Sequence, residues 1–222
     1  MNSVDLVIVG AGGFGREVLG YAVDAFAGRP RHRVAGFADD NPRALDGFDL
    51  AVGVLGRVDD VPISEATSFV IAVGDPAVRR ALAAAVEARG GRLSAVVHPT
   101  AYLGPGARLG DGCVVCLFAF VGTAATVGAN SVINVHASVG HDAVVGANCV
   151  VSPYSAISGA VELQDDVFLG THATVFPRRS VGSGAKVSAG AVVHRDVPAG
   201  ALAAGNPAKS RVLFAGAAAN RC

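Results

Sequence analysis

One histidine stands in a sequence context suited to proton transfer. His141 is followed directly by Asp142, and Gly159 comes 18 residues later. An imidazole is the usual general base at neutral pH, and a neighbouring carboxylate holds its tautomer and favours its protonated form. A glycine beside it would offer a backbone N–H to a developing oxyanion, with no Cβ in the way. These residues would support attack on an acyl group if the fold stacks position 141 against position 159.

The second half of the chain carries a six-residue repeat that would produce this stacking. Every sixth residue from Val97 to Val193 is aliphatic, through 17 positions without an insertion. Neither a helix period of 3.6 nor a strand period of 2 gives this pattern, whereas a β-helix does. The pattern resembles the left-handed hexapeptide helix, in which three hexads make one coil of roughly 18 residues. Residues 141 and 159 are therefore expected on neighbouring coils, roughly 4.8 Å apart.

The first part of the chain has the pattern of alternating strands and helices. We expect three strands and two helices there, over 4–9, 16–27, 32–37, 68–73 and 78–89. This alternation is typical of a parallel, doubly wound sheet. The predicted fold is a small Rossmann-like α/β domain over residues 1–92, followed by a left-handed parallel β-helix over residues 93–198. A C-terminal tail over residues 199–222 is expected to leave the repeat and end in a short helix.

A glycine-rich turn after the first predicted strand has the features of a phosphate site. Gly10, Gly12 and Gly15 would let the backbone approach a diphosphate at a helix N-terminus. Asp39 and Asp40 end the second strand, roughly where a ribose-binding acid belongs in a dinucleotide site. The domain is shorter than a full dinucleotide-binding fold, which disfavours an enzyme that uses a nicotinamide cofactor. A structural turn that binds no ligand remains an alternative interpretation. A domain of this length corresponds to one mononucleotide-binding half of such a fold, which suits the diphosphate of a nucleotide sugar better than a dinucleotide.

Composition and charge narrow the class of protein. Lys and Arg total 18, Asp and Glu also total 18, and no basic run stands out. A nucleic-acid partner is therefore not expected. No apolar stretch reaches the roughly 18 residues of a membrane helix, and no signal-peptide pattern is seen, so we expect a cytoplasmic protein with no membrane partner. Cys113 and Cys149 fall in one small-residue column and are expected to be core thiols.

In combination these motifs resemble a known family, the NeuD/PglD-like sugar O/N-acyltransferases. The resemblance covers nearly the whole chain and rests on five segments, Gly10–Val18, Asp39–Asn41, His98–Pro99, Asn134 with His141–Asp142, and Gly205–Lys209. It implies that the N-terminal domain holds a nucleotide-linked amino sugar and that the β-helix holds acetyl-CoA. It also implies a homotrimer with its active sites at the subunit boundaries.

The resemblance also implies roles for particular residues. His141 and Asp142 would form the catalytic pair, with Gly159 at the oxyanion and acetyl group. Substrate would be bound by Gly10, Gly12, Gly13, Phe14, Asp39, Asp40, Gly74 and Asn134. Acetyl-CoA would be bound by Gly159, Gly170, Thr171, Ala189, Gly190 and Lys209. One position departs from the family pattern, because Val150 stands where many relatives have a second histidine, nine residues after the first.

The function implied is direct transfer of acetyl from acetyl-CoA to the amine of an NDP-4-amino-deoxy sugar, with no acyl-enzyme. O-acetylation of a sialic-acid-type sugar and a non-catalytic, trimeric nucleotide-sugar-binding subunit remain as alternatives. A zinc enzyme resembling the β-helix carbonic anhydrases would need a histidine 36 residues before His136, where Thr100 stands. No metal is therefore expected. His136 and His172 share a column two coils apart and are predicted to be corner or interface residues.

Overall fold

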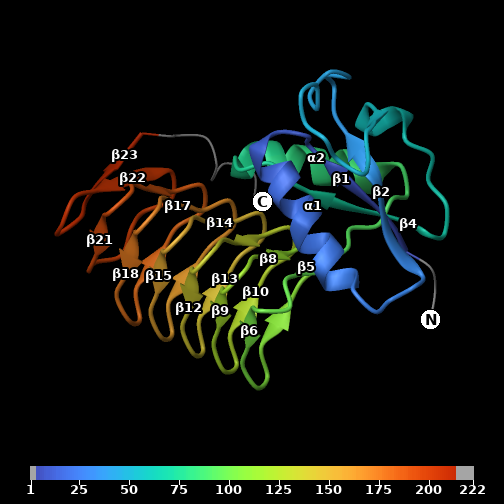
Figure 1. The fold of residues 1–222 in the computed structure, drawn as a ribbon. Helices are drawn as coiled ribbons and strands as arrows, with labels where there is room; N and C mark the ends of the chain where they lie inside the picture. Colours follow the sequence, from blue (N-terminus) through green and yellow to red (C-terminus); the bar gives the residue numbers. More distant parts are fainter. Residues whose placement is uncertain (1–3, 214–222) are drawn as a thin grey trace.

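A computed structural model describes residues 4–213 and shows an α/β unit followed by a β-helix (Figure 1). The α/β unit contains β1 (Val4–Val9), α1 (Gly13–Phe26), β2 (His32–Ala38), β3 (Val54–Gly56), the 3₁₀ helix η1 (Val58–Asp60), β4 (Thr67–Ile71) and α2 (Pro76–Ala88). Its four strands form a parallel sheet in the order β3-β2-β1-β4. The sheet confirms the predicted parallel α/β fold.

Two details of this unit differ from the sequence prediction. Helix α1 begins at Gly13, three residues before the expected start, so Gly13 and Gly15 lie in its first turn and Gly12 is its N-cap. Strand β3 and helix η1 were not predicted, because elements of three residues are too short to show a hydrophobic period. β3 lengthens the sheet by pairing with β2 at the edge opposite β4.

The β-helix consists of two-residue strands that stack in three parallel sheets, as the hexad repeat predicts (Figure 1). The first sheet contains β5 (Val96–Val97), β8 (Val114–Val115), β11 (Val132–Ile133), β14 (Val150–Val151), β17 (Phe168–Leu169) and β20 (Lys186–Val187). The second contains β6 (Tyr102–Leu103), β9 (Phe120–Val121), β12 (Ser138–Val139), β15 (Ala156–Ile157), β18 (Thr174–Val175) and β21 (Val192–Val193). The third contains β7 (Arg108–Leu109), β10 (Thr126–Val127), β13 (Val144–Val145), β16 (Glu162–Leu163) and β19 (Ser180–Val181).

Each coil contains 18 residues and turns three corners. The register pairs Val139 with Ile157, for example, and the hexad aliphatics face inward into a common core. Leu103 is an exception at 40% exposed, because it belongs to the first coil and no coil covers it from below. We call the corner between the first and second sheets the first corner, that between the second and third sheets the second corner, and that between the third and first sheets the third corner.

The segment expected as a separate tail instead continues the first sheet. β22 (Ala201–Ala204) pairs in parallel with β20, and β23 (Lys209–Val212) folds back antiparallel onto β22. Residues 209–212 thus form a strand, because β22 offers an open edge whose N–H and C=O groups need partners. The helical end that the sequence predicts after them falls mainly on residues that the structure does not describe. Residues 214–222 lie outside the described chain.

The α/β unit packs on the outer face of the first sheet. Val114 and Val132 project from that sheet into one apolar cluster with Ile8, Val18 and Phe37. Such shared burial fixes α1 over the coils, as Figure 1 shows for α1 and β5. None of the helices over residues 4–213 is long and apolar enough to cross a membrane.

A buried histidine adds a polar contact to this interface. His98 is 5% exposed and follows β5. The Thr100 N–H donates to its Nδ1 at 3.1 Å, so that nitrogen is unprotonated and Nε2–H is left to donate to Asp24 Oδ2 on α1, also at 3.1 Å. The His-Pro motif therefore joins helix α1 to the first coil.

Candidate active site

His141 lies at the second corner with its ring held by the next residue. The Nδ1 atom is 2.8 Å from Asp142 Oδ2, and because a carboxylate can only accept, Nδ1–H is the donor. The Nε2 lone pair is then available to take a proton. The backbone is fixed from both neighbouring coils, since Asp142 N donates to Thr123 O at 3.0 Å and Ala160 N donates to His141 O at 2.8 Å.

Gly159 lies directly beside the His141 ring on the next coil. A Cβ built on Gly159 would lie 2.7 Å from His141 Cε1 and 3.0 Å from Cδ2, and it would collide with Nε2. Only glycine therefore leaves room for this ring position. Within residues 4–213 no hydrogen bond uses the Gly159 N–H, so that donor is available beside the imidazole.

This arrangement has the parts of a proton-transfer centre that is open to solvent. The His141 side chain is 71% exposed and that of Asp142 is 64% exposed. A nucleophile could reach Nε2 without any rearrangement of the chain, and a backbone N–H lies nearby for an oxyanion. The geometry on which the sequence argument depends, position 141 against position 159, is thus present.

A second feature is a pocket of about 440 Å³ between the α/β unit and the β-helix. The α/β unit contributes Gly13, Phe14 and Glu17 from α1, together with Gly74 from the loop after β4. The β-helix contributes residues of the first sheet and first corner, including Asn134, Val150, Ser152 and Phe168. Four of the residues predicted to bind substrate, Gly13, Phe14, Gly74 and Asn134, therefore meet in one place.

The glycine turn at this pocket has the geometry of an anion site. Gly10 has a φ of 101°, which favours glycine, and a Cβ on Gly15 would lie 2.9 Å from the Gly10 carbonyl carbon. Gly12 caps α1 without any side-chain hydrogen bond, so the first N–H groups of the helix face outward. A phosphate group would find unpaired donors and the positive end of the helix dipole there.

The two predicted acids lie beside the turn and outside the pocket lining. Asp39 Oδ2 accepts from Ala11 N–H at 2.8 Å, and its Oδ1 accepts from Asn41 N–H at 2.9 Å. Asp40 is exposed and pairs with Arg57 at 3.3 Å. In the free chain the Asp39 carboxylate thus braces the glycine turn.

The residues predicted to bind acetyl-CoA divide between two corners. Thr171 and Ala189 lie at the first corner, and no hydrogen bond of residues 4–213 uses their N–H groups. The N–H groups of Gly170 and Gly190 are already donated to Val187 O and Thr171 O. Gly159 lies at the second corner, and Lys209 lies on exposed β23.

The pocket and the histidine are separated within one chain. Asn134 and Ser152 stand where the first sheet turns into the first corner, whereas His141 lies beyond the second sheet. One complete side of the β-helix, occupied by β12, separates them. The structure brings His141 to Gly159 and Gly74 to Asn134, but it does not bring these two groups together in a single copy.

Several residues of the pocket were not predicted from the sequence to bind substrate. Val132 and Phe168 lie in the same outward column of the first sheet as Val150, 18 residues before and after it. Val150 was noted only as a departure from the family pattern. Ser152 similarly follows Asn134 by one coil, and Glu17 follows Gly13 by one helical turn. The coil period and the helix period, applied outward from Asn134 and Gly13, would have identified them. Among residues 4–213 no group of three or more His, Cys, Asp or Glu side chains could hold a metal ion.

Two family models match the chain, one in each structural unit. Residues 5–86 match the PglD N-terminal domain. Residues 120–153 match the hexapeptide repeat of succinyl-transferase. The second match includes both His141 and Asn134.

Solved structures similar to this one extend over nearly the whole chain. The acetyltransferase domain of PglB from Neisseria gonorrhoeae is 31% identical with a TM-score of 0.85, and the match covers 93% of this chain and 99% of that one. PerB from Caulobacter crescentus, solved with CoA and GDP-perosamine, is 32% identical with a TM-score of 0.82, and the match covers 93% and 97%. The similarity therefore includes both the α/β unit and the β-helix.

Similarity to curated sequences is confined to a shorter segment. A putative acetyltransferase from Bacillus subtilis, YvoF, is 45% identical over 56 residues, which is 25% of this chain. That match spans 31% of the length of the relative. The match therefore concerns about a quarter of the chain.

Proposed function

Because the chain belongs to the NeuD/PglD-like family of hexapeptide-repeat sugar acyltransferases, we propose that it transfers acetyl from acetyl-CoA to the amine of a nucleotide-linked amino sugar. The observation that carries this proposal is His141, held by Asp142, with its ring against the bare backbone of Gly159. PerB, which was solved with CoA and GDP-perosamine, supports a nucleotide sugar as the acceptor class.

The chemistry follows from the tautomer of His141. The sugar amine attacks the thioester carbonyl carbon, forming the new C–N bond, while Nε2 takes the proton that the amine must lose. The Gly159 N–H would stabilise the negative charge on the carbonyl oxygen. The C–S bond then breaks, the sulfur of CoA leaves as a thiolate, and the proton on Nε2 can pass to it. Asp142 stabilises the imidazolium formed in between.

The pocket suits the acceptor substrate. The uncapped N-terminus of α1 offers N–H donors for a diphosphate, and Asn134 and Ser152 offer polar groups for sugar hydroxyls. Glu17 adds a negative charge at the same pocket, which attracts an amino sugar that arrives as an ammonium ion and releases one proton to solvent before the neutral amine attacks. This charge favours an amine over a hydroxyl as the acceptor group.

Acetyl-CoA would lie along the outside of the coils. The Thr171 and Ala189 N–H groups are available for the amide oxygens of its pantetheine arm, whereas those of Gly170 and Gly190 are used within the β-helix. Lys209 on exposed β23 could meet the phosphates. Thr171 and Ala189 lie at the first corner of the β-helix, whereas Gly159 lies at the second corner.

A homotrimer would resolve the separation of these features. One copy would contribute the pocket and the first corner, and a neighbouring copy would contribute His141 and Gly159 at its second corner. Closed three-fold symmetry brings two such different surfaces together at each of three equivalent interfaces. The active site would then lie between subunits.

The test of this function is a thiol-release assay with acetyl-CoA and a panel of GDP-, UDP- and dTDP-linked amino sugars. At least one amino sugar is expected to release CoA stoichiometrically with N-acetylated product. The His141→Ala variant should turn over at least about a hundredfold more slowly, because the general base is lost. It should still bind CoA. Undiminished turnover in this variant would overturn the assignment.

A further inference from the structure

A buried arginine outside the proposed site connects the two structural units. Arg79 lies in the first turn of α2 and is 0% exposed. Its Nη1 donates to Ile71 O at 2.6 Å and to Val73 O at 2.9 Å. Its Nε and Nη2 donate to Asn130 O at 2.9 and 2.7 Å, and Nη2 also donates to Asn130 Oδ1 at 2.9 Å. These five bonds match the five N–H groups of a guanidinium.

The acceptors lie on the two sides of the pocket. Val73 immediately precedes Gly74, which lines the pocket from the α/β unit. Asn130 occupies the third corner and leads through β11 to Asn134, which lines the pocket from the β-helix. One rigid, planar group therefore sets the position of the Gly74 loop relative to the coil that carries Asn134.

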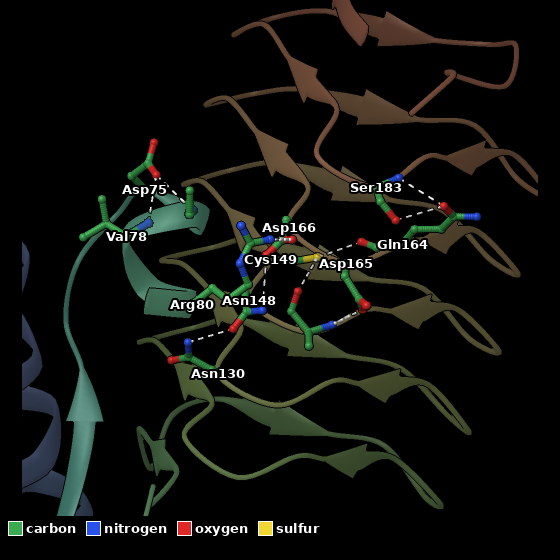
Figure 2. A network of polar contacts seen from close by, with 12 residues as sticks. Asp75, Val78, Arg80, Asn130, Asn148, Cys149, Gln164, Asp165, Asp166 and Ser183 are labelled. Carbon is green, nitrogen blue, oxygen red and sulfur yellow. Dashed lines mark hydrogen bonds and ion pairs between the residues drawn. The ribbon is translucent and has the colours of Figure 1, made fainter. Parts of the chain in front are cut away.

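A ladder of amides extends this connection over three coils. Asn130 Nδ2 donates to Asn148 Oδ1 at 2.9 Å, and Asn148 Nδ2 donates to Asp166 Oδ1 at 3.2 Å. Arg80, the neighbour of Arg79, pairs with the other oxygen of Asp166 (Figure 2). The bonds form a closed ring that begins and ends on adjacent residues of α2. Rotation of α2 on the β-helix would break several of them together.

The chemistry of the guanidinium explains why so many bonds are needed. All five bonds end on uncharged oxygens, and a buried cation is costly unless each of its donors is satisfied. Burial lowers the pKa of Arg79 to about 10, so the group stays charged at neutral pH. An apolar side chain would fill the same space without this cost, but it would form no directional bonds between the two units. The hydrogen bonds of the arginine fix the orientation of the Gly74 loop relative to the coil that carries Asn134.

We propose that Arg79 is a positioning residue that fixes the Gly74 loop over Asn134 and so sets the shape of the acceptor pocket. The identity of the pocket's ligand rests on the proposed function. The mechanical role does not, because it follows from the five hydrogen bonds alone.

Kinetics of two variants test the consequence for substrate. Arg79→Lys keeps the charge but has three donors and no planar fork. Asn130→Gly keeps the carbonyl acceptor and suits the φ of 55° but removes Oδ1. With GDP-perosamine as the probe, each variant should raise the KM for the sugar nucleotide about tenfold or more while the KM for acetyl-CoA stays within about twofold.

The control is Asn148→Gly, which breaks the ladder one coil further on without touching Arg79. Asn148 has a φ of 57°, close to the 55° of Asn130, so glycine is tolerated at position 148 as well. Both of its KM values should remain within about twofold of the parent protein. An unchanged sugar-nucleotide KM in Arg79→Lys and Asn130→Gly, or an equal rise in both KM values, would overturn the positioning role.

Hydrogen exchange in the ligand-free protein tests the mechanical role without any substrate. Amides over residues 72–78 should exchange about tenfold faster in Arg79→Lys, because the loop loses bonds that hold it closed. Asn148→Gly should leave them unchanged. If the parent protein acetylates no amino sugar, the proposed function fails and this measurement still decides. Unchanged exchange in Arg79→Lys would then refute the positioning role by itself.

Discussion

At the scale of single residues, the proposed chemistry depends on an absent side chain. The His141 ring occupies the space where any residue other than glycine at position 159 would place its Cβ. The contact involves the far end of an exposed side chain, which can move away at little cost to the fold. A change at Gly159 should therefore affect catalysis much more than stability.

The Gly159→Ala variant separates these two effects. The new methyl group should push the imidazole from its place by about 1 Å, and misplacement on that scale can reduce turnover about a hundredfold. We expect this loss in kcat, with the urea midpoint nearly unchanged. Ser158→Ala, the preceding position on the same coil, is the control and should retain activity. A fully active Gly159→Ala protein would show that the ring position seen here is irrelevant to turnover.

At the scale of elements, the corners of the β-helix carry conformational strain. Between residues 4 and 213, eleven non-glycine residues have a positive φ, all at corner positions, and Ala124 is one of them with a φ of 57°. The strand pairing at 18-residue spacing requires this left-handed turn irrespective of the residue that occupies it. A side chain with a Cβ costs roughly 1–2 kcal/mol in that conformation.

Ala124→Gly should therefore stabilise the protein. Relief of the strain outweighs the greater chain entropy of glycine in the unfolded state, which leaves a gain of about 0.5–1 kcal/mol in the free energy of unfolding. Ala129→Gly is the matched control, since Ala129 is also exposed but is not among the positive-φ residues. Its unfolding free energy should fall by about 0.5–1 kcal/mol. Urea titration of both variants gives the sign of each change in the free energy of unfolding. Changes of the same sign in the two variants would contradict the strain at Ala124.

The elements were largely predictable because one period dominates the sequence. The hexads place Val139 over Ile157, and hence His141 beside Gly159, by counting alone. The strand after Lys209 was not predictable in this way, because its partner β22 shifts the pairing, with Lys186 opposite Leu202 rather than Ala204. Periodicity therefore determined the coils but not the way they end.

The pocket was harder to predict because it depends on contacts between distant segments. Gly74 and Asn134 were selected separately, and the pairing of Arg79 with Asn130 that brings them together spans 51 residues without a motif. Arg79 lies on an Ala-rich helix where a basic residue is ordinarily taken as solvent-exposed. No pattern in the sequence distinguishes it from Arg80, which is exposed.

At the scale of the whole molecule, buried thiols make the stability of the fold decrease with rising pH in the alkaline range. Burial raises the pKa of Cys149 to about 12 from its ordinary value of 9.0, and it raises the pKa values of Cys113 and Cys116 as well. Above pH 9 the unfolded chain loses thiol protons that the folded chain keeps. The unfolding free energy should therefore fall as pH rises from about 9 to about 12.

Cys149→Ala isolates one of these contributions. At pH 10 the parent protein should have lost about 1 kcal/mol of the stability advantage that it holds over the variant at pH 7, because pH 10 lies about one unit above the pKa of the thiol in the unfolded chain. Urea titrations of both proteins at the two pH values give this difference. An equal cost of the substitution at pH 7 and pH 10 would mean that the Cys149 thiol titrates alike in both states.

At the scale of the whole molecule, the proposed function needs more than one copy of the chain. The acceptor pocket and His141 lie on opposite sides of β12 in the same chain, so the proposed reaction requires His141 from one copy to serve the pocket of another. Two inactive variants can expose this dependence. His141→Ala lacks the base, and Gly74→Trp should fill the pocket without backbone strain, since a Cβ at Gly74 has no atom within 4 Å.

The most direct measurement is the acetyltransferase activity of the proposed homotrimers when they are assembled from equal amounts of these two inactive chains. A site that joins His141 of a Gly74→Trp chain to the pocket of a His141→Ala chain is intact, and random assortment makes about a quarter of the sites of this kind. We expect recovery to about a quarter of parental turnover after joint refolding, and none after simple mixing of preformed trimers. Mixed trimers with no activity would contradict it.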